Sequence, residues 1–510
     1  MVRRAPVDRT ASIEGISSRV RLAGDGLFVL GFLAVAYRLR RAPLRPRSLW
    51  LDDAWPALVT RVPWNRVPVV GLTSSGYSVV LKLWMHLVGF SEFHAQIPAL
   101  AFGLLGPVGV FLAARRMHLT QLPAAIAGAI VLVSPDHIIY SSRVKQYTLD
   151  ALLATIVIIL AFAVIEEPQR AGRWAQLVAF AAIATAASSL VVTTVAGALL
   201  AACLAARTSA AGKREQLKVP AYAVGSYGLF AVAWWLVALR PHINPSLKAY
   251  WAAFYIRLNA SFPRDLGEAG LRIAKGLSSV PSGLGLAVLI ASGAVVIWRR
   301  RDRAVLVLTP VAVAVVLAMF QLAPLGAGRT DLNLYPVLAL TVGLAANELR
   351  HALRAWRVLA IVLLVAVLAT VRAAPPYPVE DMRSATAYLE ANVHPSDEVL
   401  VYWAARYPLA LYARSWGLQI DRSRHTAEGF EVHIQRPNLY VLPDHSTDHR
   451  AYEPVLLRLT RGQKRVWFIG SHGRLDAVAI QKQLSHLGYH AAARRSGDKY
   501  HAFVMLWIKP

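Results

Sequence analysis

Long apolar runs recur along most of the chain and constrain its fold more than any other feature. The 510 residues have a mean hydropathy of +0.43, too high for a soluble protein of this length. Since roughly 20 apolar residues cross the bilayer core, the runs predict a mainly α, polytopic membrane protein with about eleven transmembrane helices. The expected spans are 23–38, 97–114, 122–140, 147–165, 174–189, 190–206, 219–239, 282–298, 304–320, 332–347 and 356–372.

The net charge of +26 follows the loops between these runs rather than the pattern of a nucleic-acid-binding protein. Basic residues cluster in alternate short loops, for example at Arg115-Arg116 and Arg299-Arg300-Arg301. Lys and Arg are enriched in cytoplasmic loops. We therefore expect a multi-pass protein of the plasma membrane with a cytoplasmic N-terminus, and no nucleic-acid partner.

The same pattern divides the chain into three parts. Residues 1–21 form a cytoplasmic arm, 22–374 a transmembrane module and 375–510 an extracytoplasmic domain. Strand-like and helix-like segments alternate in the last part, which predicts a small α/β fold. Residues 77–90 are expected to form an amphipathic helix in the membrane interface. The predicted outer loops are 39–96, 134–147, 240–281 and 321–331.

An acid pair, Asp52-Asp53, follows the first apolar run and lies between Trp50 and Trp55. Ionisable groups at a bilayer are costly, so they are candidates for function. Asp52 could act as a general base toward a hydroxyl, and Asp53 could orient it or share a divalent cation with it. The alternative is a helix cap or a hydrated interfacial pair.

Three cations fall on other predicted outer loops: Arg143, Lys145 and Arg329. Cations that face a cleft on this side suit a phosphate or pyrophosphate group. The alternative is that their side chains extend to the membrane interface. Asp136 and His137 are weaker candidates on the same loop as Lys145. In the tail, the spacing of His445 and His449 fits a metal site, but surface histidines are the expected outcome.

Several segments together resemble the GT-C superfamily, in particular its bacterial branch of dolichyl-phosphate-mannose-like and aminoarabinose-transferase-like enzymes. The resemblance covers about 50 to 375. Two departures are Asp53 where the family has Glu, and LTSSGYSVVL at 72–81 where a His-Pro-Pro or Lys-Pro-Pro element is usual. The matching segments are LWLDDAW at 49–55, VGFSEFHAQIPALAFG at 88–103 (with Gln96 for the usual Arg), Ser142 to Leu152 with Lys145 and Tyr147, and Arg329 followed by Tyr335-Pro336.

The resemblance implies an inverting glycosyltransferase that moves a sugar from a polyprenyl-phosphate donor to a hydroxyl of a glycan, lipid or protein. It implies Asp52 as general base, Asp53 as its partner, and Arg143, Lys145 and Arg329 as ligands of the donor phosphate. Possible further members of the site are Asp136, His137, Tyr147 and Tyr335. A lipid donor arrives through the bilayer, so no nucleotide-binding motif is needed. A divalent cation at Asp52 and Asp53 stays open.

Two alternatives belong to other classes of protein. A transporter or flippase for a lipid-linked or anionic substrate would bury charges in mid-helix and break its helices in paired positions. A catalytically inactive acceptor-binding relative would keep the fold without the chemistry. The sequence places its charges on outer loops and retains Asp52, which favours transfer.

Overall fold

A computed structural model gives the architecture of most of the chain. The predicted span at 356–372 falls outside the described residues, apart from two isolated positions. The described residues are 9–41, 43–44, 47–71, 74–209, 217–240, 245–350, 358, 361, 380–426, 429–445, 448–472, 474–496 and 502–510.

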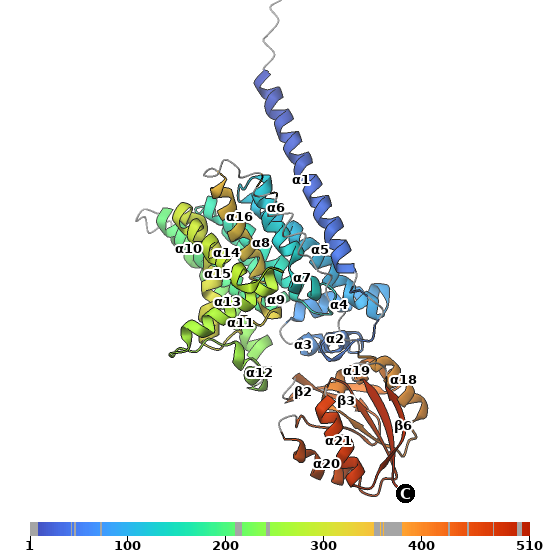
Figure 1. Ribbon diagram of the computed structural model, residues 1–510. Coiled ribbons are helices and arrows are strands. Elements are labelled where there is room, and N and C mark those ends of the chain that lie inside the picture. The colour runs from blue at the N-terminus through green and yellow to red at the C-terminus, as the bar shows by residue number, and fades with distance from the viewer. Residues whose placement is uncertain are drawn as a thin grey trace, which may run out of the picture.

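Helices make up the larger part of the described chain and pack as one bundle (Figure 1). Six of them are long and apolar enough to cross a membrane, and two further apolar helices are shorter. The prediction of a mainly α, multi-pass membrane protein is thus confirmed. The bundle helices are α1 (Arg9–Arg41), α5 (Glu92–Arg116), α6 (Gln121–Val133), α8 (Tyr147–Glu166), α9 (Ala171–Ala187), α10 (Val192–Ser209), α11 (Lys218–Trp234), α14 (Ser282–Arg299), α15 (Arg301–Met319) and α16 (Tyr335–Leu349).

Local sequence signals explain the ends and the close packing of these helices. Ser91 caps α5, since its Oγ accepts from the backbone N–H of His94 at 3.0 Å. Within the bundle, a Cβ on Gly197 of α10 would lie 2.4 Å from the Cα of Pro310 in α15. Small residues let the backbones of membrane helices approach this closely, so a glycine is required there.

One predicted span is wrong, because the run at 122–140 is not a single helix. Helix α6 ends at Val133, and a separate helix, α7 (Pro135–Tyr140), begins after Ser134. Pro135 lacks the N–H that a continuous helix needs and suits a first helical position. Ser134 caps α7 and donates to the carbonyl of Gly276 at 2.8 Å. Helix α7 therefore belongs to the predicted outer loop at 134–147.

The predicted outer loops carry short helices of their own. The amphipathic helix expected at 77–90 is α4 (Ser75–Val88). The loop at 240–281 holds a longer amphipathic helix, α13 (Phe262–Leu277), whose Leu277 end packs against α7. The remaining pieces are α2 (Leu51–Ala57), η1 (Leu58–Thr60), η2 (Trp64–Arg66), α3 (Val67–Gly71), η5 (Trp235–Leu239), α12 (Pro245–Tyr250), η7 (Ala252–Phe254) and η8 (Arg329–Asp331).

The C-terminal part is the α/β domain that the sequence predicted. Its main sheet has the order β4-β1-β5-β7-β6, with β4, β1 and β5 parallel and β7 antiparallel to both neighbours. The elements are α18 (Met382–Asn392), β1 (Glu398–Val401), η9 (Trp403–Ala405), α19 (Arg406–Tyr412), β2 (Gly417–Thr426), β3 (Gly429–Gln435), β4 (Leu439–Val441), η10 (His449–Ala451), α20 (Tyr452–Leu459), β5 (Arg465–Gly470), α21 (Arg474–His486), β6 (His490–Ser496) and β7 (Phe503–Ile508).

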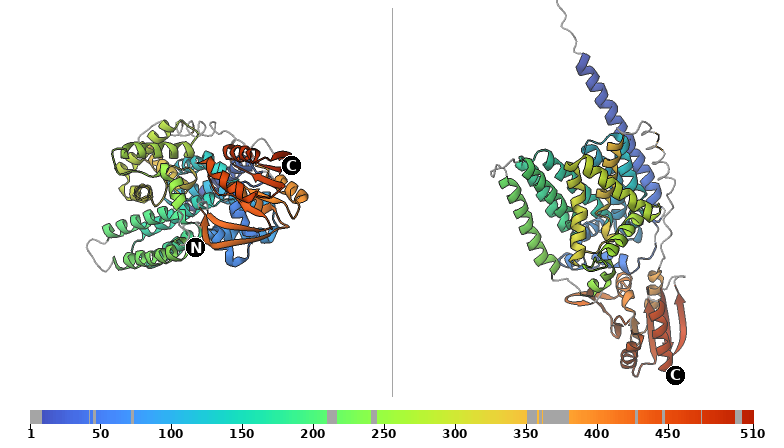
Figure 2. Two further views of the ribbon diagram at one scale, coloured as in Figure 1. Left: turned by 90° about the horizontal axis from the view of Figure 1, so that it is seen from below. Right: turned by 60° about the vertical axis from the view of Figure 1, so that its left-hand side comes forward.

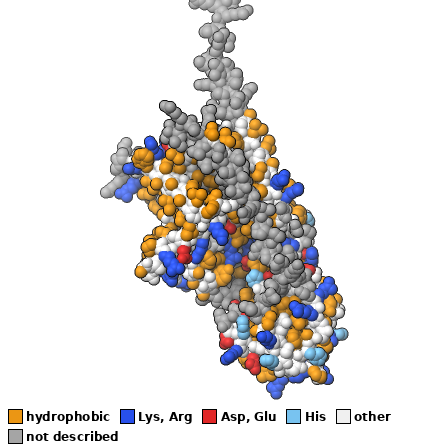
Figure 3. All heavy atoms as spheres, in the orientation of Figure 1, with side chains coloured by type: hydrophobic (Ala, Val, Ile, Leu, Met, Phe, Trp, Pro, Cys, Tyr) orange, Lys and Arg blue, Asp and Glu red, His pale blue; other side chains and the backbone are white. Residues whose placement is uncertain are grey.

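This domain docks on one end of the bundle, over the loop that contains α2 (Figures 1 and 2). The Arg61 guanidinium donates to the carbonyls of Ala413 and Trp416, both at 2.9 Å. The backbone N–H of Leu49 donates to the Tyr412 hydroxyl at 2.6 Å. In the face drawn in Figure 3, hydrophobic side chains gather over the bundle and charged ones over the junction and the domain. The apolar surface is where a bilayer would lie.

Candidate active site

A cavity of about 530 Å³ lies where the C-terminal domain meets the bundle. All four predicted outer loops reach it, although they are far apart in the sequence. The residues that line it are Trp50, Leu51, Asp52, Asp53, Trp55, Tyr140, Arg143, Lys145, Tyr147, Tyr250, Trp251, Phe254, Ala327, Arg329, Trp403, Asp444 and His472.

Asp53 is the buried member of the acid pair, with 2% of its surface exposed. Its Oδ2 accepts from Arg143 Nη1 at 2.8 Å and from Trp50 Nε1 at 3.1 Å. Its Oδ1 accepts from the backbone N–H of Val144 at 3.1 Å. A buried carboxylate needs such partners. Asp53 therefore ties the first outer loop to the second and fixes the position of its neighbour.

Asp52 takes a different direction, because adjacent residues of a helix project about 100° apart at 3.6 residues per turn. Its Oδ2 accepts from Arg329 Nη1 at 2.8 Å, and 26% of its side chain is exposed. Burial raises the pKa of Asp52, but the charges of Lys145, Arg329 and Arg143 outweigh burial and leave that pKa below its usual value. Asp52 is therefore an ionised carboxylate at neutral pH.

Aromatic rings contact two cations of the cavity, Lys145 and Arg329. Lys145 Nζ lies 5.4 Å from the centroid of the Trp55 ring, and Arg329 Cζ lies 4.9 Å from that of Trp251. Such contacts orient a cation without neutralising it. Burial lowers the pKa of Lys145, and the opposing charge of Asp52 partly offsets that effect. The cavity thus places the ionised Asp52 carboxylate beside cations whose side chains are oriented by aromatic rings.

The four residues that the sequence named as possible site members separate into two groups. Tyr147 lines the cavity, where its ring contacts that of Tyr140 with centroids 4.9 Å apart. Asp136 and Tyr335 do not line it: the Tyr335 hydroxyl donates to Asp136 Oδ2 at 2.7 Å and ties α16 to α7. His137 is fully buried, with its Nδ1 2.9 Å from Nη2 of Arg40.

Sequence reasoning missed the contribution of the C-terminal domain to this cavity. Trp403, Asp444 and His472 come from three separate segments of that domain. The ring of His472 packs on Trp50 with centroids 4.9 Å apart. No local motif marks these residues, because they reach the cavity only through the docking of one domain on the other.

The acid pair does not have the form of a cation site in the described residues. Asp52 and Asp53 each accept from an arginine. Among the residues that the structure describes, no three His, Cys, Asp or Glu side chains gather closely enough to hold a metal ion. Hard cations such as Mg²⁺ and Ca²⁺ need several oxygen ligands. The described side chains therefore do not fit the divalent cation considered for this pair.

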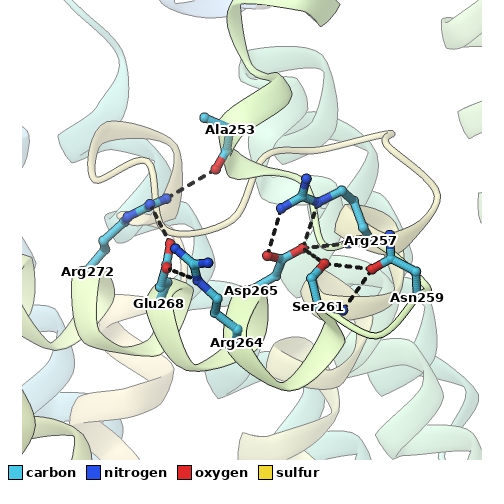
Figure 4. Close-up of polar contacts among 8 residues, drawn as sticks. All are labelled: Ala253, Arg257, Asn259, Ser261, Arg264, Asp265, Glu268 and Arg272. Carbon is cyan, nitrogen blue, oxygen red and sulfur yellow. Dashed lines mark hydrogen bonds and ion pairs between the residues drawn. The ribbon is translucent and has the colours of Figure 1, made fainter.

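A second cavity, of about 410 Å³, adjoins Phe254 on the side of α13. Figure 4 shows the ion pairs that line it. Arg257 Nε lies 3.0 Å from Asp265, while Arg272 bonds Glu268 at 3.1 Å and the carbonyl of Ala253 at 3.2 Å. These contacts clamp the segment of η7 to α13. They thereby support the aromatic residues just before it, which face Arg329.

Comparisons with known proteins identify the fold. No protein-family model matches the sequence, and no curated protein matches it either. Solved structures do match. ArnT from Cupriavidus metallidurans in the apo state gives a TM-score of 0.55 at 15% identity, covering 94% of this chain and 98% of that one. The same protein bound to undecaprenyl phosphate gives 0.51 at 15% identity, with 94% and 97% covered.

An oligosaccharyltransferase of Archaeoglobus fulgidus, in complex with zinc and sulfate, gives a TM-score of 0.50 at 11% identity, covering 87% of this chain and 68% of that chain. The chain has the GT-C fold. The resemblance seen in the outer loops is thus confirmed at the level of the fold. The GT-C likeness extends further than the sequence suggested, since the ArnT match covers 94% of the chain and not only residues 50 to 375.

Proposed function

We propose that the chain is an inverting glycosyltransferase that uses a polyprenyl-phosphate-linked sugar and an acceptor hydroxyl. The observation that carries this proposal is the contact of Asp52 with Arg329 at 2.8 Å, in a cavity that Lys145 also lines. A base beside phosphate-binding cations is the arrangement that such a transfer needs. A GT-C neighbour in complex with undecaprenyl phosphate supports the class of donor.

In the proposed reaction, Asp52 removes the proton of the acceptor hydroxyl as its oxygen attacks the anomeric carbon. The bond from that carbon to the phosphate oxygen breaks, and its electron pair leaves with the polyprenyl phosphate. Lys145 and Arg329 stabilise the growing charge on the phosphate. Arg143, which is buried against Asp53, adds its charge to the same wall. The acceptor is a glycan, lipid or protein of the cell envelope.

The resting contact between Asp52 and Arg329 gives the donor a way to activate the base. A phosphate that binds Arg329 competes with Asp52 for the guanidinium. Loss of that hydrogen bond, together with a new negative charge nearby, would raise the pKa of Asp52. Asp52 would then become a stronger base only when donor is present, which limits unproductive chemistry in the empty site.

A transporter would need charges along a path through the bundle. The charges of this cavity instead come from α2 and from loops at the end of the bundle where the C-terminal domain docks. This placement favours transfer at a membrane surface. We propose that this surface is the outer face of the plasma membrane, with the N-terminus in the cytoplasm. Alkaline-phosphatase fusions test this orientation. A fusion after Pro378 should be active, and a fusion within 299–303 should be inactive.

The function is tested with the full-length protein in lipid nanodiscs and a panel of polyprenyl-phosphate sugars. We expect release of polyprenyl phosphate from at least one donor, with faster release when a cell-envelope extract supplies acceptors. The released sugar is followed by mass spectrometry of the products. Movement of intact donor across a vesicle membrane without cleavage would instead establish the transporter.

A further inference from the structure

His472, in the C-terminal domain, is a titratable residue of the cavity that has no role in the proposed transfer step. His472 Nδ1 lies 3.1 Å from Oε1 of Glu380, a carboxylate that is 6% exposed. Ser471 Oγ donates to the other oxygen of Glu380. Since a carboxylate only accepts hydrogen bonds, Nδ1 carries the proton, and Nε2 of a neutral His472 is then an acceptor. Glu380 thus sets both the tautomer and the orientation of the imidazole.

The backbone and the packing of His472 also suggest a functional position. His472 has a φ of 66°, in the left-handed region that non-glycine residues rarely adopt and that costs free energy. Its ring packs against that of Trp50 at an interplanar angle of 42°, and the Trp50 indole N–H donates to Asp53. His472 therefore lines the same cavity as Asp52 and is held there from both domains.

The order of basicity in the cavity gives a direction for proton flow. The hydrogen bond that His472 donates to Glu380 raises the pKa of His472, burial lowers it, and the charges of Glu380 and Asp52 raise it further. The pKa of Asp52 is held below its usual value. Once the polyprenyl phosphate has left and Arg329 pairs with Asp52 again, a proton on Asp52 is held weakly, whereas the neutral imidazole of His472 in the same cavity binds a proton more strongly. The other charged residues that line the cavity are Asp53, Arg143, Lys145, Arg329 and Asp444.

We propose that His472, oriented by Glu380, is the second proton carrier of the transfer reaction and is supplied by the C-terminal domain. The inference rests on the proposed function. The proton leaves the acceptor hydroxyl for Asp52, passes to Nε2 of His472 and is released to water, so Asp52 returns to its ionised form for the next turnover. The C-terminal domain is then a part of the catalytic machinery and not only a cover over it.

The test uses the full-length protein with a donor that the panel identifies. His472→Gly should lower kcat by at least about 10-fold, short of the 10²–10⁴ typical of a primary general base, and leave the KM for the donor unchanged. Added imidazole should restore part of the lost kcat, because it replaces the missing proton carrier. A histidine that serves only to dock the domain would not be rescued in this way.

The pH profile gives a second measurement. Because the neutral imidazole accepts the proton, kcat should rise as pH rises through the pKa of His472. Glu380→Gln removes the charge that raises this pKa and leaves a weaker, neutral hydrogen-bond acceptor, so the acidic limb of the profile should move to lower pH, with a reduced plateau. This shift is independent of whether His472→Gly perturbs the docking of the domain.

His449 is a matched control within the same domain. It also pairs with a carboxylate, that of Asp476, and its side chain is 40% exposed against 45% for His472, but it does not line the cavity. His449→Gly should keep the parent kcat, and added imidazole should not change it.

If the parent releases no polyprenyl phosphate from any donor, the proposed function fails and this inference with it. If the parent is active but His472→Gly is unaffected or cannot be rescued, and Glu380→Gln leaves the pH profile in place, only the proton-carrier role is overturned.

Discussion

Two groups of arginine–carboxylate ion pairs in this protein have similar nitrogen–oxygen distances and different surroundings. At the cavity, Arg143–Asp53 and Arg329–Asp52 each measure 2.8 Å and join residues 90 and 277 positions apart. On α13, Arg264–Glu268 measures 2.9 Å across four positions, and its side chains are 80% and 41% exposed. The first group joins separate outer loops around the cavity, and the second lies along the surface of one helix. Distance alone therefore does not tell which ion pair matters; burial and sequence separation do.

The largest effect on turnover is expected at Asp52, the cavity carboxylate that we propose as the general base. Asp52→Asn keeps the shape of the side chain but cannot take a proton, so turnover should fall by about 10²–10⁴. Thermal stability should change little, because Asp52 is part exposed. Release of polyprenyl phosphate from the active donor measures the loss.

Asp302→Asn is the control for this variant, since Asp302 is 64% exposed, follows Arg301 in the sequence and does not line the cavity. It should behave as the parent. Turnover by Asp52→Asn within a few-fold of the parent would remove Asp52 from the mechanism and leave Asp53 or His472 as the candidate base.

Asp53→Asn should damage the fold more than the chemistry. Arg143 and Asp53 are 4% and 2% exposed, and removing one charge of a buried pair typically costs about 3–5 kcal/mol. We expect a lower midpoint of thermal unfolding in detergent. A variant that unfolds with the parent and loses only turnover would show instead that Asp53 acts on the substrate.

Lys145→Ala separates donor binding from proton transfer. Loss of a hydrogen bond to a charged group should weaken binding of undecaprenyl phosphate by about 1.5–3 kcal/mol, measured as Kd in nanodiscs. Lys275→Ala removes a lysine of α13 that lines neither cavity and should bind as the parent does. An unchanged Kd for Lys145→Ala would place the donor phosphate elsewhere.

The helices and the charged loops were predictable from the sequence because they depend on local patterns. Apolar runs marked the bundle, and Asp52, Lys145 and Arg329 drew attention as charges beside those runs. The break at Ser134-Pro135 coincides with the start of the predicted outer loop at 134–147, although the predicted apolar span was extended through it to 140. Local patterns thus located the helices and the charged loops along the chain, but they did not show which loops would contact one another.

The direction in which each side chain points and the docking of the C-terminal domain on the bundle could not be predicted from local patterns. Asp136 and Asp52 both follow apolar runs, yet Asp136 turns to Tyr335 and Asp52 to Arg329. That choice depends on helix rotation within the packed bundle. His472 lies 420 positions after Asp52 and reaches the cavity through the docking of the two domains, to which Arg61 and Tyr412 contribute. Its role needs the tertiary structure.

The smallest effect on stability and turnover is expected on α13, where a substitution tests the exposed group of ion pairs. Glu268→Gln removes the charge that both Arg264 and Arg272 contact. Exposed pairs of this spacing contribute about 0.2–1 kcal/mol each and are screened by salt. The midpoint of thermal unfolding and the turnover should both stay close to those of the parent, with any small difference vanishing at high salt. A large loss of turnover with intact folding would show that the clamp of η7 on α13, through Arg272 and the Ala253 carbonyl, controls the aromatic residues that face Arg329. The exposed group would then be part of the site, and burial would no longer separate the two kinds of ion pair.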